Sequence, residues 1–200
     1  MADTQNVIVP GEITTGYGFV GVAGAALPTD PTKDIAEAVG KSFGRIGEDG
    51  ITRSFSSDSE EIKDMFGNTV ATVKTSDSET FGFSMLDVNE TSLAIFYGAK
   101  NVTGSKETGF TIKSNGKWTS ERAYILRFIV GEDEANETVT YGLIVIPKGK
   151  LTERGDQTIT GSDAIGHEIT ITALPDASGH RAYLYTSAPV STKATGTTGE

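Results

Sequence analysis

The side chains best suited to chemistry gather in one short stretch, GEDGITRSFSSDSEEIKDMFGN at residues 47–68. It holds six carboxylates and two cations. Such a run could bind a metal ion, supply a carboxylate pair for acid–base catalysis, or form a surface that fits a second copy of the chain. Residue types and spacing distinguish these three interpretations.

Metal binding requires oxygen ligands at fixed spacing. The calcium loop of an EF-hand needs ligands at alternate positions, glycine at the sixth position and glutamate at the twelfth. Counting from Asp58, the sixth residue is Lys63 and the twelfth is Thr69. The stretch therefore fails this test, and its spacing favours a solvated surface over a metal site.

The remaining patterns for catalysis are weak. His167 and His180, the two histidines of the chain, have no clear carboxylate partner in the sequence. The glycines of GYGFVG, residues 16–21, match the dinucleotide-binding pattern, but that pattern needs a helix directly after it, and Pro28 and further glycines follow instead. The sequence therefore predicts no catalytic residue, no metal site and no cofactor, in a protein that is not an enzyme.

The composition describes an acidic domain that needs no covalent staple. Its 200 residues suit one domain, and the absence of cysteine fits folding in a reducing cytosol. The net charge of −10 opposes nonspecific binding to nucleic acid, because lysine and arginine supply most phosphate affinity. Apolar runs fall far short of the roughly 18 residues of a membrane helix, and the N-terminus lacks a secretory pattern. We therefore expect no membrane partner.

Alternation of apolar and polar side chains indicates that most elements are strands. Residues 79–86 alternate large apolar with small polar side chains, and the same period of two recurs in 138–146 and 167–173. Residues 122–130 are apolar on both faces, which predicts a strand covered on both sides. Residues 69–75 predict a weaker strand.

Helical patterns are few. Residues 32–44 carry apolar side chains at helical spacing. Residues 89–97 predict a second helix, with Asn89 as a good cap and Gly98 as the stop. The acidic stretch predicts one helical turn at 58–66, where carboxylates are favourable in the first turn.

Three segments read as extended. Residues 1–25 predict an N-terminal arm, and residues 187–200 predict a flexible C-terminal tail that cannot bury enough surface to order itself. Residues 98–121, rich in Gly, Lys, Asn, Ser and Thr, predict an extended basic loop. Within it, residues 110–118 read as a hairpin with its turn at Asn115-Gly116.

Four segments keep an order and spacing that is typical of one family. They start with LPTDPTKD at 27–51, SDSEEIKD at 57–76, ETFGFSML at 79–98 and YGLIVIPK at 141–179. Together they resemble the major tail tube proteins of bacteriophages with long, noncontractile tails, most closely those of phages that infect actinobacteria. The resemblance covers most of residues 27–179, and the whole set rather than one motif carries it.

The resemblance implies a mainly β fold: a β-sandwich or partial barrel with one or two short flanking helices, a long extended hairpin loop and flexible termini. It implies a single tail-tube domain over residues 1–186. Subunits of this family assemble as hexameric rings whose inner sheets join around a pore, and the rings stack into a tube through which the genome passes.

The resemblance also implies partners and a location. The partners are other copies of the chain, the tape measure protein, and the tail terminator and distal tail proteins. Viral DNA passes through without specific binding. The protein would be made in the host cytoplasm and reside in the virion tail.

A water-filled lumen calls for small polar side chains and few cations, since each lysine or arginine would bind phosphate. The polar faces of strands 79–86 and 138–146 meet this requirement, and we expect these two rather than 167–173 to line the pore. The acidic turn at 131–137 is a candidate for the pore wall or rim. The candidate lumen-facing residues are Thr80, Gly82, Ser84, Thr138, Thr140, Gly142, Glu132, Asp133 and Glu134.

Charge segregation suggests how copies meet. Residues 100–127 carry six bases against two acids, whereas 47–68 is acidic. We expect the basic loop to reach a neighbouring subunit or ring and to face the acidic stretch, so that repeated complementary charges set the register. The candidate contact residues are Lys100, Lys106, Lys113, Lys117, Trp118, Glu48, Asp49, Asp58, Glu60, Glu61 and Asp64.

Two alternatives stay open at this point. One is the tube subunit of a contractile tail or of a type VI-like secretion system, which shares the fold and the ring. The other is a β-sandwich binding module, which would expose a patch of aromatic side chains. The single tryptophan, Trp118, lies in the basic segment, and the other aromatics alternate as core residues do.

Overall fold

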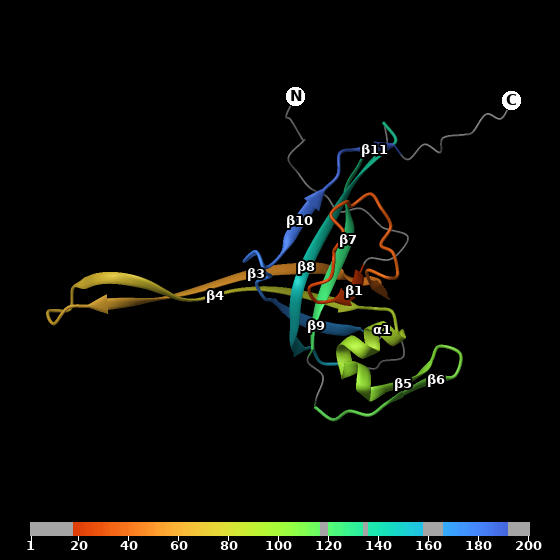
Figure 1. Ribbon diagram of the computed structural model, residues 1–200, viewed down its shortest axis with the longest axis horizontal. Coiled ribbons are helices and arrows are strands. Elements are labelled where there is room, and N and C mark those ends of the chain that lie inside the picture. Colours follow the sequence, from red (N-terminus) through yellow and green to blue (C-terminus); the bar gives the residue numbers. More distant parts are fainter. Residues whose placement is uncertain (1–17, 117–119, 134–135, 158–165, 192–200) are drawn as a thin grey trace.

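The computed structural model describes residues 18–116, 120–133, 136–157 and 166–191, which form a mainly β protein as predicted (Figure 1). The elements in chain order are β1 (Gly18–Val22), β2 (Lys41–Gly44), β3 (Ile46–Lys63), β4 (Thr69–Met85), α1 (Glu90–Leu93), the π-helical turn η1 (Ala94–Gly98), the 3-10 turn η2 (Ala99–Asn101), β5 (Val102–Ser105), β6 (Gly109–Ile112), β7 (Glu121–Asp133), β8 (Thr138–Arg154), β9 (His167–Ala173), β10 (Tyr183–Thr186) and β11 (Val190–Ser191).

One antiparallel sheet contains nine of these strands. Its order is β2-β1-β7-β8-β9-β4-β3, and β10 and β11 also pair with β8. The two ends of this order, β2 and β3, are joined in the chain by Arg45 alone. The sheet therefore curls back towards its own beginning without closing into a barrel.

Strand β8 belongs to two layers. Its N-terminal half lies between β7 and β10, and its C-terminal half lies between β7 and β9. The change occurs at a β-bulge, where Pro147 and Lys148 together stand opposite Ala123. Proline is tolerated there because a bulge leaves one residue out of the ladder.

The main core lies inside the curled sheet. Phe43 of β2 stacks on Phe83 of β4 with ring centroids 5.6 Å apart, which brings one end of the strand order against the strand next to the other end. The predicted alternation of 79–86 and 167–173 is confirmed, since the large apolar residues of both strands are buried in this core. The strand predicted at 122–130 is confirmed within β7, and its residues are buried on both faces.

A second apolar cluster covers the outer face of β7 and β8. Ile35 and Val39, from the segment between β1 and β2, belong to this cluster together with Leu143 of β8. The helix predicted over 32–44 is wrong, because the described segment has only turns before strand β2 begins at Lys41. The apolar spacing reflects docking on the sheet.

Arg127 of β7 holds this segment in place. Its Nε donates to the main-chain oxygen of Pro31 at 2.9 Å, and its Nη1 donates to Asp34 Oδ1 at 3.0 Å. The guanidinium also lies over the ring of Tyr141, 4.9 Å from its centroid. A buried cation thus receives oxygen partners that offset its loss of water.

The helix predicted at 89–97 is confirmed as α1 and η1. Asn89 Oδ1 accepts a hydrogen bond from the Ser92 N–H at 2.8 Å, and Ser92 Oγ accepts one from the Asn89 N–H at 3.0 Å. This reciprocal capping box satisfies two donors at the helix start. Gly98 ends the segment with a φ of +90°, a conformation that glycine adopts without strain.

The helical turn predicted at 58–66 is wrong. Residues 58–63 lie in β3, which pairs with the whole of β4, and the strands predicted at 69–75 and 79–86 are one continuous strand. The fold class expected from the sequence includes a long extended hairpin loop. In the structure the long hairpin is β3–β4, which contains the acidic stretch, rather than the basic segment 98–121.

The described part of the basic segment 98–121 contains a two-stranded hairpin. This hairpin is β5–β6, with its turn at residues 106–108, whereas the second strand of the hairpin predicted over 110–118 lies mostly outside the described residues. Asn101 holds it against the helical segment by donating from Nδ2 to the main-chain oxygen of Tyr97 at 2.6 Å. A side-chain hydrogen bond of this kind cannot be predicted from the periodicity of the sequence.

The predicted extended ends are shorter than expected. Residues 18–22 of the predicted arm 1–25 form β1, in the middle of the sheet between β2 and β7. Ser187 donates its N–H to Tyr141 O at 2.9 Å, and β11 pairs with the start of β8, so the first part of the predicted tail is also in the sheet. Residues 1–17 and 192–200 lie outside the described residues.

Candidate assembly surfaces

The most prominent feature is a projecting hairpin, which we call the arm (residues 56–78). At Glu79, β4 makes its last pair with β9, opposite Ala173. Beyond that point β3 and β4 pair only with each other, up to Lys63 opposite Thr69. The arm therefore extends away from the rest of the chain, which we call the body (Figure 1).

The two faces of the arm differ in composition. Cross-strand pairs share a face, and the pairs Ile62–Ala71 and Glu60–Val73 put three apolar side chains and one carboxylate together. On the other face, Lys63 pairs with Glu61 at 3.4 Å, and Glu61 also accepts a hydrogen bond from Thr69 Oγ1 at 3.2 Å. A strand pair with an exposed apolar face and no core of its own indicates a surface that is covered in an assembly.

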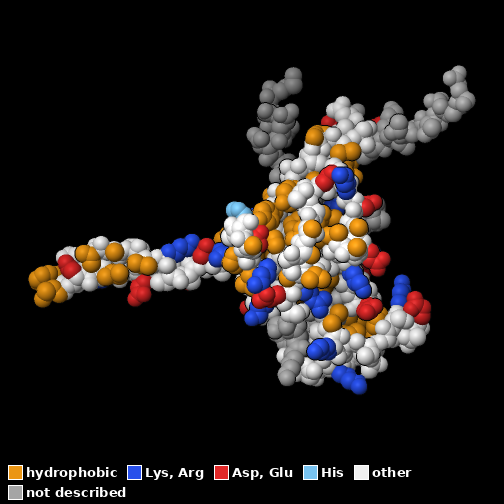
Figure 2. Space-filling view, viewed as in Figure 1, with side chains coloured by type: hydrophobic (Ala, Val, Ile, Leu, Met, Phe, Trp, Pro, Cys, Tyr) orange, Lys and Arg blue, Asp and Glu red, His pale blue; other side chains and the backbone are white. Residues whose placement is uncertain are grey.

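The tip of the arm is a tight, fully bonded turn. Asp64 Oδ1 accepts the N–H groups of Phe66 at 2.9 Å and Asn68 at 2.8 Å, and the Asp64 N–H donates to Asn68 O at 2.8 Å. The hydrogen bonds from Asn68 lower the pKa of Asp64 most. Gly67 supplies the left-handed conformation with a φ of +86°. The turn leaves Met65 and Phe66 facing solvent, and Figure 2 shows hydrophobic side chains at this free end.

Two arginines bind the root of the arm. Arg181 Nη1 lies 2.8 Å from Asp77 Oδ2, and Arg53 Nε lies 2.6 Å from Glu79 Oε1. Arg53 also lies over the ring of Phe55, 4.7 Å from its centroid. Glu79 is buried at the point where arm and body meet, so its pairing with Arg53 satisfies a charge removed from water.

A broad polar face lies on the side of β4 opposite the main core. Thr80, Gly82 and Ser84 stand directly opposite Thr172, Thr170 and Glu168 of β9. Thr152 of β8 continues the row, with its Oγ1 3.1 Å from Thr172 Oγ1, and Thr52 and Ser54 of β3 extend it on the other side. We call the set Thr52, Ser54, Thr80, Gly82, Ser84, Thr152, Glu168, Thr170 and Thr172 the polar face.

The sequence predicted that the polar side of 79–86, but not that of 167–173, lines the pore. In the structure the two strands are neighbours and their polar sides form one surface. Directly paired residues share a face, so β9 presents its polar side wherever β4 does. Two charges flank the face: Asp49 lines the same hollow as Thr80, and Lys150 stands opposite Thr172.

The second predicted lumen triad lies on the other side of the sheet. Thr138, Thr140 and Gly142 alternate in phase with Ile146, which is buried in the main core. Gly142 is itself buried, and a Cβ there would lie 2.6 Å from Cζ of Phe128. The two triads therefore do not share one sheet surface, because Thr138, Thr140 and Gly142 are on the core side of β8, whereas Thr80, Gly82 and Ser84 are opposite the core.

The acidic turn lies at the far end of β7 and β8. Glu132 and Asp133 end β7, and Asp133 accepts the Asn136 N–H at 3.1 Å and the Asn136 side-chain amide at 2.7 Å. Asp133 thus stabilises the turn into β8. Glu134 lies outside the described residues.

The predicted contact residues separate into three groups. Lys100, Lys106 and Lys113 surround the β5–β6 hairpin. Asp58, Glu60, Glu61 and Asp64 lie on the arm, whereas Glu48 and Asp49 lie at the body end of β3. Lys117 and Trp118 lie outside the described residues. Because the arm points away from the hairpin, its acids can meet these lysines only on another copy (Figure 1).

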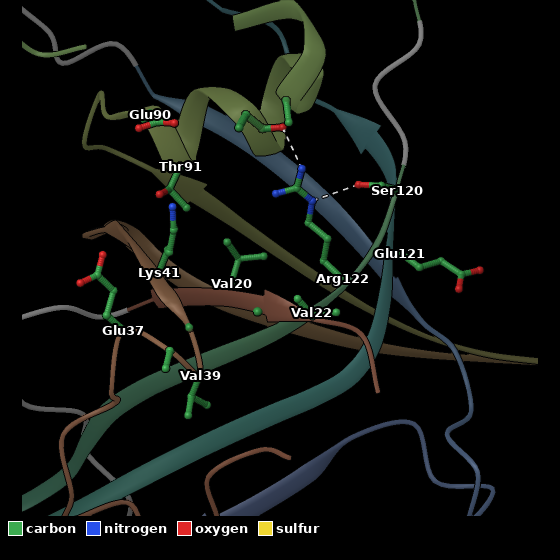
Figure 3. A pocket seen from close by; sticks show the side chains of 15 residues that line it. Val20, Val22, Glu37, Val39, Lys41, Glu90, Thr91, Ser120, Glu121 and Arg122 are labelled. Atoms are coloured by element: carbon green, nitrogen blue, oxygen red, sulfur yellow. Dashed lines mark hydrogen bonds between the residues drawn. The ribbon is translucent and has the colours of Figure 1, made fainter. Parts of the chain in front are cut away.

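A hollow of about 480 Å³, which we call the socket, lies between β1, β2 and α1 (Figure 3). Its apolar lining comes from Val20, Val22, Val39, Ala94 and Ala99. Arg122 forms one wall, where its Nε donates to Ser120 Oγ at 3.0 Å and its Nη2 to Ala94 O at 3.5 Å.

The two histidines of the chain lie in different environments. His167 is buried against the rings of Phe96 and Tyr97, and burial lowers its pKa. His180 is exposed in a turn whose main-chain N–H groups bind Asp176. Within the described residues, no group of three or more His, Cys, Asp or Glu side chains could hold a metal ion.

Sequence reasoning missed the tip and part of the polar face. The signal for the tip was the segment Asp64-Met-Phe-Gly-Asn68 between two β-rich runs, which is a turn pattern with glycine at its fourth position. The signal for Thr170 and Thr172 was the alternation of residues 167–173, a strand predicted to lie away from the pore.

A family model described as phage tail tube protein matches residues 1–196. The chain belongs to this family. The phage tail tube family consists of structural proteins, and membership in it makes the chain a component of the virion tail. It confirms the resemblance to phage tail tube proteins.

Two further comparisons complete this result. Among curated proteins, no significant match is found. A solved structure described as the cap of an anti-feeding prophage, a tube-terminating cap, aligns with 94% of this chain and 100% of its own at 12% identity and a TM-score of 0.39. No helix in the described part of this tail tube protein is long and apolar enough to cross a membrane.

Proposed function

We propose that copies of this chain assemble into hexameric rings that stack into a hollow tube, and that the viral genome passes through it. The polar face carries this proposal. It is a continuous surface of small hydroxyl side chains over four strands, on a sheet whose other side is an apolar core. A wall beside moving DNA needs such a surface, because hydroxyl groups bind phosphate less strongly than cations do.

The strand order supports assembly through sheet edges. Among the described strands, β3 pairs on one side only, with β4. An unpaired edge of this length invites another strand, and a ring that joins successive sheets leaves no such edge inside. The polar face, including Thr80, Gly82 and Ser84, then lines the lumen, where Asp49 and Glu168 add negative charge and Lys150, opposite Thr172, adds one cation.

The charges of the arm support contacts between subunits or rings. Its acids Asp58, Glu60 and Glu61 meet Lys100, Lys106 and Lys113 of a neighbouring copy. Each exposed pair contributes only about 0–1 kcal/mol, so repetition around the ring sets the register. The family resemblance adds the tape measure protein and the tail terminator and distal tail proteins as further partners of the tube.

Electron microscopy of the concentrated, purified chain tests this function. We expect hollow rings with sixfold symmetry and tubes built from them. A chain that stays monomeric at high concentration and is missing from purified tails would overturn the proposal. Lys106→Glu with Lys113→Glu should reduce tube yield, and Glu60→Lys with Glu61→Lys on a second copy should restore it. Lys33→Glu, at an exposed lysine of the segment between β1 and β2, is the charge control.

A further inference from the structure

The apex of the arm has apolar side chains that lack a partner within the described chain. Met65 is 89% exposed and Phe66 is 80% exposed. The polar groups of the turn, by contrast, are bound to one another through Asp64 and Asn68. The turn therefore holds its shape without help and presents two large apolar groups. Aromatic side chains in such positions dominate many interfaces, and methionine adapts to irregular pockets.

The socket offers an apolar recess at another place on the same chain. Val20 and Val39 lie at its base, and Val22 of β1 is 76% exposed at its mouth (Figure 3). The socket carries both signs of charge, with Lys41 and Arg122 beside Glu37, Glu90 and Glu121. Because two cations and three carboxylates leave only one net negative charge, apolar contact rather than net charge selects what fills the recess.

The arm of a given copy cannot reach its own socket. The apex lies at one extreme of the molecule, and β1 and α1 lie at the other (Figure 1). The nine residues of β3 from Phe55 to Lys63 extend the arm by about 30 Å at the usual rise of a strand. That length carries the apex past the edge of its own body and towards an adjacent one.

We propose that Met65 and Phe66 of one copy insert into the socket of a neighbouring copy. The inference rests on the proposed self-assembly and names the contact that links successive subunits. A projection on one face and a recess on another form a heterologous contact, in which each copy both gives and receives. Such contacts propagate and produce either a closed ring or a helical stack.

The size of the contact explains how it would operate. An aromatic side chain buries about 150–250 Å². A stable complex buries about 800 Å² on each partner. The tip alone is therefore too small to hold two free copies together. It acts once per subunit in an assembly that other surfaces have already aligned.

Disulfide trapping tests the contact, because the natural chain contains no cysteine. The variant Phe66→Cys, Val22→Cys is assembled and mildly oxidised, then separated on a non-reducing gel. We expect a ladder of covalent multimers, since a disulfide forms only where Cα atoms lie within about 7 Å. The matched control is Phe66→Cys, Leu184→Cys, in which the second site is an exposed aliphatic residue of β10; it should stay monomeric.

The outcomes separate this contact from the proposed function. If the Phe66→Cys, Val22→Cys variant forms tubes but gives no ladder, the proposed contact is wrong and the proposed tube function stands. The same conclusion follows if the Leu184 control gives an equal ladder. A natural chain that forms no rings or tubes overturns both.

A second variant covers the case in which the cysteines prevent assembly. Met65→Ser with Phe66→Ser should lower tube yield at least tenfold with an unchanged melting temperature, while Val88→Ser, at another exposed apolar site, should keep the natural yield. Normal yield from the double serine variant would also overturn the contact.

Discussion

Arg181 holds the arm against the body by binding both the carboxylate and the main-chain oxygen of Asp77. Its Nη1 donates to Asp77 Oδ2 at 2.8 Å, and its Nη2 donates to the main-chain oxygen of Asp77 at 2.7 Å. The hydrogen bond from Arg181 is the main reason that the pKa of Asp77 lies below its usual value. Asp77 stands just beyond the last pair of β4 with β9, so this contact sets the direction in which the arm leaves the sheet.

Replacing Arg181 with alanine should loosen the arm and leave the body folded. Exposed ion pairs add little to global stability, so the melting temperature should stay close to that of the natural chain. Amide hydrogen exchange in residues 69–78 should speed up, because the base of the hairpin loses two hydrogen bonds. Lys33→Ala removes the exposed pair with Asp30 and is the control. Unchanged exchange in the arm would show that Arg181 does not hold it.

A cation placed on the polar face should slow DNA passage. An added Cβ at Gly82 meets no atom within 4 Å, so Gly82→Lys and Gly82→Glu both fit the fold. In virions that carry Gly82→Lys, we expect normal tails but slower genome ejection, with the difference shrinking as salt is raised, because phosphate contacts release counterions. Gly82→Glu should eject at the natural rate. Equal rates for both variants would place Gly82 away from the lumen.

His167 should make the fold less stable in mild acid. Burial lowers its pKa below the usual value of 6.5, and its Nδ1 has no hydrogen-bond partner among the described residues. Between the lowered pKa and 6.5 the unfolded chain binds a proton that the folded chain does not, so the free energy of unfolding falls as pH falls.

Thermal unfolding at two pH values measures this effect. His167→Phe keeps an aromatic ring beside Phe96 and should lose less melting temperature than the natural chain between about pH 7.5 and about pH 5. His180→Gln, at the other histidine, is the control and should behave as the natural chain does. An equal acid slope in the His167 variant would show that this histidine does not contribute.

Gly142 should not tolerate a side chain. An added Cβ would lie 2.5 Å and 2.6 Å from two ring atoms of Phe128. Gly142→Ala should therefore lower the free energy of unfolding by about 1–3 kcal/mol, as overpacking commonly does. Gly131→Ala is the matched control in the same pair of strands, since its Cβ meets no atom within 4 Å. Chemical denaturation measures both, and equal stabilities would show that the Phe128 ring moves aside freely.

The sequence predicted correctly those elements whose secondary structure follows from their own residue pattern, whatever they pack against. The alternation of 167–173 coincides with β9, and the Asn89 cap and Gly98 stop coincide with the ends of the helical segment. In both cases the side chains that define the element also make its decisive contacts, through core burial for β9 and through the capping box for α1.

The errors arose where tertiary pairing overrode a local preference. Ser57-Asp58 followed by two glutamates is a good helix start, yet residues 59–63 pair with 69–74, which are rich in threonine and valine. Residues 32–44 have helical spacing because separate turns dock on β7 and β8. The phase of β8 changes at Pro147, so its two halves present opposite faces, and periodicity within 138–146 could not reveal that.

The shared strand β8 has a mechanical consequence. It is hydrogen-bonded to strands of both layers, so the two layers of the body cannot separate without breaking hydrogen bonds of β8. The two strands of the arm pair only with each other, so the arm can unfold locally and refold while the body stays folded. Stiffness and compliance thus reside in different stretches of one polypeptide, with the changeover at Glu79.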